Sequence, residues 1–332
     1  MAILFVGAEK NDFIPFGTVE NITDSTFFDA NFSRAAIQPS GTSNGESFVR
    51  ASLTQASADI WIHFFLHMEV PDFRRNLPLL EIRDESTNTP LFRIDNNETY
   101  RPQYWDGGSW VNLKTNEIST ATDADYDVHV KIDATAGLFV VYQDAAEVYR
   151  FEGDTSSIIN STTMDTVDFK SLSDTSTTFS SSLNQFSQVA LADEKTLGWK
   201  IATLGVTAQG TETDWTGDNT NVDEITLDVN DFISSDTAGQ IETFAIADLP
   251  TAASSLIVKE VGVLVSALRD STGPSQLELV ARTNSTNYFS STLALSTSFE
   301  SYFHGWTTNP NTGVEWTQTE VDALELGVRS VT

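Results

Sequence analysis

The chain shows its clearest pattern where apolar and polar side chains alternate with a period of two residues. Between Ile60 and Val70, and again between Asp125 and Asp133, every second residue is apolar. This is the period of a pleated strand, whose side chains point alternately to the two faces of a sheet. Because the apolar residues alternate with polar ones instead of forming one continuous run, we expect antiparallel strands with one face in a core.

Turn-forming residues separate these strands into hairpins. The strand Leu79–Arg83 runs into Asp84–Asn88, and Gly137 follows the strand Asp125–Asp133. The segment Asp106–Ser109 places two glycines between aromatic residues, which is typical of a hairpin tip. Strands that recur at spacings of about ten residues favour a sandwich or jelly roll. The sequence therefore predicts an all-β fold of two tandem antiparallel β-sandwich domains that resemble jelly rolls.

Changes in composition suggest how the chain is divided. Residues 206–221 contain very few apolar side chains, and we predict that they form a linker. The first sandwich is assigned to residues 25–205, and the second to residues 222–332. Residues 1–24 open a stretch in which Gly and Pro separate short apolar clusters. We predict that they form an N-terminal arm, ordered by neighbouring subunits.

In the second domain the most apolar segment is Leu256–Ala267, which has apolar residues on both faces. It is predicted to be a central strand that pairs with Gln276–Arg282. Near the end of the chain, Thr317 and Glu320 have the spacing of a capping box, and Gly327 suits the position after a helix. These signals predict one short C-terminal helix that closes the sandwich.

The charge of the chain limits its partners. It has 332 residues and carries 47 Asp and Glu against 18 Lys and Arg, a net charge of −29. With no basic excess it is not expected to bind nucleic acid or anionic membranes. It has no cysteine, so disulfides and thiolate catalysis are excluded. Its first residues lack the pattern of a secretory signal, and no apolar run has 18 residues, so we expect synthesis in a cytoplasm without membrane insertion.

A pair of carboxylates at the correct spacing would indicate hydrolysis of a glycan. The densest candidates are Glu81, Asp84 and Glu85. On a strand Glu81 and Glu85 share a face with Arg83, while Asp84 points to the other side, and jelly-roll glucanases typically have an aspartate where Arg83 stands. We therefore favour a polar strand that ends in a turn, and we expect no catalytic residue.

Two other groups of polar residues are candidate metal sites. His63 and His67 are four residues apart on a predicted strand, about 13 Å from each other, which is too far for one metal ion. The acidic loops Asp106–Ser109 and Asp214–Glu224 offer oxygen ligands of the kind that Ca²⁺ prefers, but neither has a defined ligand spacing. We predict no cofactor and no metal.

Aromatic side chains around one hairpin tip are the candidate carbohydrate-binding residues. They are Tyr100, Tyr104, Trp105 and Trp110. Sugar rings stack on the faces of such side chains. The alternative is that all four pack in the core or at the rim of the sandwich, where such folds place most of their tryptophans.

Two segments resemble known families. Asp125–Asp133, followed by Ala136–Tyr142 and Val148–Phe151, resembles the concanavalin A-like lectin/laminin-G jelly roll, over about residues 25–205. His304–Thr317, followed by Val321–Val328, resembles the C-terminal closure of virion structural proteins of tailed bacteriophages. This second resemblance implies a component of a virus particle and supplies no catalytic residue.

From these observations we expect a non-enzymatic structural protein of a tailed phage virion, either a capsid decoration or head fibre or a minor tail or fibre protein. It would act by docking to other virion proteins, as a homo-oligomer. The first alternative is a carbohydrate-binding module that attaches the virion to a host surface glycan. The second is a jelly-roll glycan hydrolase.

Overall fold

The structure is a computed structural model that describes residues 3–7, 9–40, 46–68, 77–97, 99–115, 117–118, 123–172 and 184–332. The chain divides into two units, Met1–Ile201 and Ala202–Thr332, each with its own core. Each unit is described by itself.

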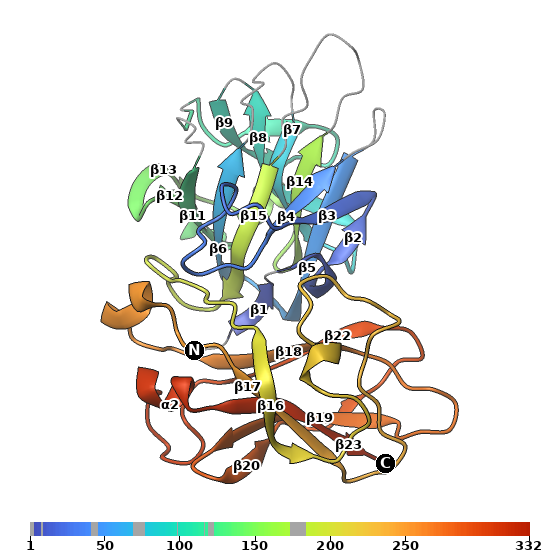
Figure 1. The fold of residues 1–332 in the computed structure, drawn as a ribbon. Helices are drawn as coiled ribbons and strands as arrows, with labels where there is room; N and C mark the ends of the chain where they lie inside the picture. Colours follow the sequence, from blue (N-terminus) through green and yellow to red (C-terminus); the bar gives the residue numbers. More distant parts are fainter. Residues whose placement is uncertain are drawn as a thin grey trace. The chain divides into compact units, whose positions relative to one another are not determined.

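The first unit consists of two antiparallel sheets (Figure 1). The eight-stranded sheet has the order β13-β12-β11-β6-β15-β4-β3, with β1 also paired to β15. Its strands are β1 (Ile3–Gly7), β3 (Thr18–Ile22), β4 (Ala36–Ser40), β6 (Asp59–Met68), β11 (Asp123–Lys131), β12 (Gly137–Gln143), β13 (Ala146–Gly153) and β15 (Asn184–Ala192).

The seven-stranded sheet has the order β10-β9-β8-β7-β14-β5-β2. Its strands are β2 (Ile14–Phe16), β5 (Glu46–Ser57), β7 (Leu77–Asp84), β8 (Thr89–Asn97), β9 (Thr99–Trp105), β10 (Trp110–Asn112) and β14 (Met164–Leu172). A short 3-10 helix η1 (Lys10–Asp12) and the single turn α1 (Ser156–Ile159) complete the described secondary structure of the unit.

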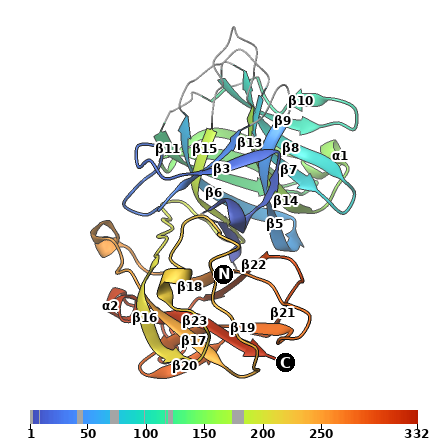
Figure 2. The ribbon, with the colours of Figure 1, turned by 45° about the vertical axis from the view of Figure 1, so that its right-hand side comes forward.

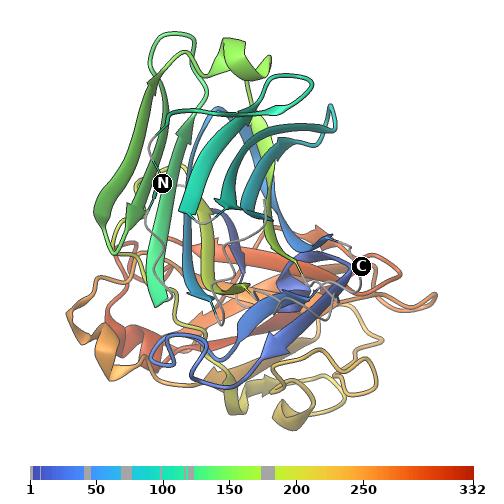
Figure 3. The same ribbon diagram turned by 90° about the horizontal axis from the view of Figure 1, so that it is seen from above.

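The two sheets of the first unit lie face to face (Figure 3). Apolar side chains from both sheets form one core between them. Phe64 and Phe186 of the eight-stranded sheet contact Phe169 of the seven-stranded sheet, with ring centroids 5.5 and 5.3 Å apart. All three rings are fully buried. Edge-to-face contacts of this kind stabilise a core beyond the burial of area alone. The prediction of an antiparallel β-sandwich is confirmed.

The prediction of a separate N-terminal arm at residues 1–24 is wrong. Strand β1 pairs with β15, and β2 and β3 join the two sheets as strands. Leu4 and Phe13 belong to the main core. The apolar clusters here are so short that Gly and Pro interrupt the period of two, yet each is long enough to add a strand to a sheet that already exists.

The second unit contains a six-stranded sheet and a two-stranded sheet (Figure 2). The larger has the order β16-β17-β23-β19-β20, with β21 also on β19, and the smaller pairs β18 with β22. The strands are β16 (Val206–Thr213), β17 (Ile241–Ile246), β18 (Val261–Ala267), β19 (Gln276–Thr283), β20 (Thr286–Phe289), β21 (Leu293–Ala294), β22 (Glu300–Trp306) and β23 (Glu325–Val331). Helical turns are η2 (Asn219–Asn221), η3 (Thr251–Ser255) and α2 (Gln318–Asp322).

Two predictions for this unit are wrong. Residues 206–221 are no linker, because β16 occupies half of them and Trp215 packs against the core. The segment Leu256–Ala267 forms a strand only from Val261, and this strand pairs with β22 and not with β19. The apolar residues Leu256 and Ile257, expected inside a sheet, are exposed.

The predicted helix is present as α2, and its capping box is confirmed. Thr317 accepts a hydrogen bond from the backbone of Glu320, and the Glu320 carboxylate accepts one from the backbone of Thr317. Losing such a cap costs about 1 kcal/mol. We expect Thr317→Ala to lower the free energy of unfolding of the second unit by about that amount in urea titrations. The same value for Thr312→Ala, on the turn before the helix, would contradict a specific capping effect.

Candidate functional site

The outward side of the seven-stranded sheet carries an unusual number of charged and aromatic side chains. On each strand one set of alternate residues, such as Ile82 on β7 and Phe169 on β14, lies in the core. The residues between them face away from the core. We call this outward side the polar face.

One row of the polar face crosses every strand of the sheet. The register pairs Asn112 with Gln103, Gln103 with Arg93, Arg93 with Glu81, Glu81 with Asp168, Asp168 with Arg50 and Arg50 with Ile14. Residues that are far apart in the sequence thus form a single line perpendicular to the strands. At a strand spacing of about 4.8 Å the line is about 29 Å long.

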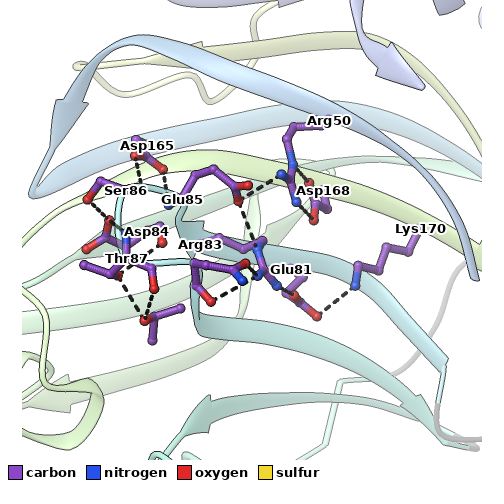
Figure 4. A network of polar contacts seen from close by, with 12 residues as sticks. Arg50, Glu81, Arg83, Asp84, Glu85, Ser86, Thr87, Asp165, Asp168 and Lys170 are labelled. Atoms are coloured by element: carbon purple, nitrogen blue, oxygen red, sulfur yellow. Dashed lines mark hydrogen bonds and ion pairs between the residues drawn. The ribbon is translucent and has the colours of Figure 1, made fainter. Parts of the chain in front are cut away.

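At the centre of the row, Arg50 and Asp168 form a bidentate pair (Figure 4). The Nε and Nη2 groups of Arg50 donate to the two carboxylate oxygens of Asp168 at 2.6 and 2.8 Å. Arg50 also contacts Glu85 at 2.8 Å. The Asp168 side chain is 1% exposed. Burial raises the pKa of Asp168 above its ordinary value, although the Arg50 guanidinium opposes this effect.

Beside this pair, Glu81 is held by two cations (Figure 4). Arg83 donates to one of its carboxylate oxygens at 2.5 Å and Lys170 to the other at 2.9 Å. Burial by itself would raise the pKa of Glu81, but the two cations outweigh burial and hold this pKa below its ordinary value. Glu81 is therefore ionised at neutral pH, and both of its oxygens are occupied.

This arrangement is poorly suited to glycan hydrolysis. A general acid needs a raised pKa and a proton to give to the leaving group. Glu81 has the opposite shift, and Asp168 is locked in a bidentate pair. Asp84 accepts hydrogen bonds from Ser86 and Thr87 and so stabilises its own turn.

Two indole rings flank the β10 end of the row. Trp105 and Trp110 lie on the polar face with their ring centroids 5.4 Å apart, and the Arg93 guanidinium lies 4.5 Å from the Trp110 ring. Arg93 donates to Gln103 at 2.7 Å, and Gln103 donates to Asn112 at 2.8 Å. These contacts fix the rings and polar groups in place before any ligand arrives.

The structure separates the four predicted carbohydrate-binding residues into two pairs. Tyr100 is 1% exposed and packs edge-to-face on Tyr126 in the core, so it presents no ring face to a ligand. Tyr104 also packs against the core. We therefore withdraw these two tyrosines as ligand contacts, because residues of opposite parity on one strand face opposite sides of the sheet. Trp105 and Trp110 remain candidates.

At the other end of the row, a second aromatic pair lies across the edge strand β2 and its neighbour β5. The rings of Phe16 and Phe48 stack with their centroids 4.3 Å apart. The Arg50 guanidinium lies 5.0 Å from the Phe16 centroid, which connects this pair to the centre of the row. Phe16 is exposed to solvent. The polar face thus has aromatic side chains at both ends.

The histidines and acidic loops have local partners. His63 Nδ1 lies 2.9 Å from Asp127, and His67 pairs with Asp123 on the same two strands. In the loop Asp106–Ser109, the Asp106 carboxylate accepts the backbone amides of Gly108 and Ser109. Within the described ranges, no three His, Asp or Glu residues form a group that could hold a metal ion.

Sequence reasoning missed most of this site. Arg50 lies on β5, Arg93 on β8, and Asp168 and Lys170 on β14, and no local spacing connects these three strands. One signal could have found them. In each strand, alternate residues point away from the core, and charged residues at these positions in several strands indicate a polar sheet face.

Comparison with known proteins gives no family. No family model matches the chain, and no curated protein is similar to it. Among solved structures, the cellulose-induced protein Cip1 is 10% identical with a TM-score of 0.41, over 57% of this chain and 92% of that one. The carbohydrate-binding module CBM66 of Bacillus subtilis is 12% identical with a TM-score of 0.33, over 56% and 96%.

A sialidase is 10% identical with a TM-score of 0.34, over 48% of this chain. The match spans only 15% of the sialidase. At these values none of the three similarities bears on ligand or reaction. In the part of the chain that the structure describes, no helix combines the length and apolar character needed to span a bilayer.

Proposed function

We propose that the first unit binds a glycan across its polar face and that the protein is not an enzyme. The observation that carries this proposal is the β10 end of the row, where the half-buried indoles of Trp105 and Trp110 lie beside Arg93, Gln103 and the exposed Asn112. Sugar rings stack on aromatic faces, and the guanidinium and amide groups beside the indoles offer hydrogen-bond partners to sugar hydroxyls. The centre of the row, with Glu81 and Asp168, is buried.

The charges favour a neutral glycan over a polyuronate. Each described cation on the polar face has a carboxylate beside it: Arg50 pairs with Asp168, Arg83 and Lys170 with Glu81, Arg93 with Asp95, and Arg101 with Glu117. A uronate would have to compete with these partners. It would also approach a chain of net charge −29, which repels polyanions.

Calorimetry with the full chain tests both glycan binding and the preference for neutral glycans. We expect binding of neutral oligosaccharides such as cello-, xylo- or laminari-hexaose, and much weaker binding of hexamers of mannuronate or galacturonate. Trp105→Ala is expected to lower the affinity for the neutral ligand about tenfold or more, because it removes a stacking surface. The matched control is Trp199→Ala, a half-buried indole outside the polar face.

Some outcomes would contradict the proposal. They are equal losses from Trp105→Ala and Trp199→Ala, stronger binding of the uronates, or no binding in a broad screen of neutral glycans. Cleavage of a bound glycan that is lost in Glu81→Gln would reject the non-enzymatic part alone.

We also propose that this glycan-binding protein is a surface component of a tailed-phage virion. The support is the resemblance of His304–Thr317 and Val321–Val328 to virion proteins, in a chain whose charge suits neither nucleic acid nor anionic membranes. Mass spectrometry of particles purified from the source of the gene tests this assignment. Absence of the chain from every particle preparation would reject it. A homo-oligomer stays a prediction, which sedimentation velocity can check.

A further inference from the structure

The second unit has a hollow on its surface with a mixed lining of apolar and polar side chains. It measures about 670 Å³ and is lined by two segments, residues 254–258 and 314–318. Of its lining side chains, Ile257 is 68% exposed, Val314 is 61% exposed and Leu256 is also exposed. Apolar side chains that are exposed singly are common, but three around one hollow mark an interaction surface.

The walls of the hollow are held rigidly. Val258 and Trp316 form a β-bridge between the two segments, and the Trp316 indole donates to the Trp306 carbonyl at 2.8 Å. Gln318 donates to the Ala253 carbonyl at 2.5 Å and connects the segments again. The exposed residues are therefore presented by a fixed frame, and a ligand would not have to order this surface.

The turn that carries Val314 is equally constrained. The backbone amide of Asn309 donates to the carbonyl of Val314, and the backbone amide of Gly313 donates to the carbonyl of Asn309, both at 2.8 Å. Gly313 adopts a positive φ of 73°, which suits glycine. A closed turn of this kind holds the Val314 side chain at the rim of the hollow.

The charge around the hollow limits what can fill it. Glu315 is the charged residue among the lining side chains, and Glu320 and Asp322 follow on α2. Hydrogen bonds from Thr317 hold the pKa of Glu320 below its ordinary value, so this residue stays ionised. The whole unit has eighteen acidic side chains and only four basic ones. A second copy of the chain would bring like charges together, and a symmetric contact would place Glu315 near its own copy.

We propose that this hollow is the docking site for a segment of another protein that has apolar side chains flanked by lysine or arginine. The apolar side chains would cover Ile257, Val314 and Leu256. The basic residues would pair with Glu315 and the acidic residues of α2. This interaction is independent of glycan binding by the first unit.

The test measures binding of two synthetic peptides to the full chain by fluorescence anisotropy. One peptide alternates leucine and lysine, and the other alternates leucine and glutamate. We expect the cationic peptide to bind at least tenfold more tightly than the anionic one, with an affinity that decreases as salt is added. Ile257→Ser and Val314→Ser are each expected to weaken the cationic peptide about tenfold.

The control is Val229→Ser, which changes an apolar side chain of similar exposure, 54%, outside the hollow. It is expected to leave peptide binding unchanged. Equal binding of the two peptides, or an equal loss from Val229→Ser and Ile257→Ser, would overturn the proposal. So would a dimer of the unmodified chain that dissociates on Ile257→Ser, because the occupant would then be a second copy.

Discussion

Replacing Arg50 with alanine is expected to lower the free energy of unfolding of the first unit by about 3–5 kcal/mol. The physical reason is the burial of Asp168, whose carboxylate would lose both of its guanidinium hydrogen bonds and keep its charge in a site closed to solvent. The Arg50 side chain also covers Phe16 and Phe48. Urea unfolding, followed by a probe in the first unit, measures the loss.

Two companion variants identify the cause. Arg150 pairs with Glu147 and Glu152 on the surface, and Arg150→Ala is expected to cost less than 1 kcal/mol. Adding Asp168→Asn to Arg50→Ala is expected to restore part of the stability, because it removes the unpaired buried charge. If the double variant is no more stable than Arg50→Ala, the loss comes from packing and our explanation is wrong.

Asp127→Ala is the second substitution with a large expected effect, about 3 kcal/mol in the same unit. Asp127 accepts from Thr196 at 2.6 Å and lies 2.9 Å from the ring of His63. All three residues are buried, so removing the carboxylate leaves two buried polar groups without their partner.

The chain provides a matched control for this substitution on the same pair of strands. His67 and Asp123 are also register partners, but Asp123 is exposed. We expect Asp123→Ala to cost less than 1 kcal/mol, since water replaces the lost contact. Similar losses for Asp127→Ala and Asp123→Ala, measured by urea unfolding, would show that burial does not set the cost of breaking these pairs.

The sequence was sufficient to predict the fold class and many of the strands of the first unit. A strand with one buried face has a period of two, and Ile60–Val70 and Asp125–Asp133 show this period clearly. The C-terminal helix was also predictable, since its capping box is local. In each case the signal lies within about ten residues of chain.

Strand β14 shows where such local reading fails. It lies between β7 and β5 near the middle of the seven-stranded sheet, yet its sequence Met164–Leu172 lies within residues 155–182, which are rich in Ser and Thr and show no clear strand pattern. Its outward side carries Asp168 and Lys170, which other strands neutralise. Burial of charged residues in a central strand is favourable only when those partners from other strands neutralise them.

The second unit shows the opposite error. Leu256–Ala267 is the most apolar part of that unit, and hydrophobicity alone indicates a buried central strand. Its first residues instead line the exposed hollow, and the actual centre of the sheet is β23 between β17 and β19. Apolar residues kept at a surface for an interaction cannot be distinguished from core residues by composition.

The direction of the row on the polar face has a mechanical consequence. A polymer bound along it would exert its pull across the strands, parallel to the backbone hydrogen bonds, so tension would tend to peel the sheet open from an edge. The edge strand β10 has three residues and little backbone pairing to resist such peeling. The side-chain hydrogen bonds from Arg93 to Gln103 and from Gln103 to Asn112 run in the direction of this load. They would therefore strengthen the edge of the sheet against the pull of a bound polymer.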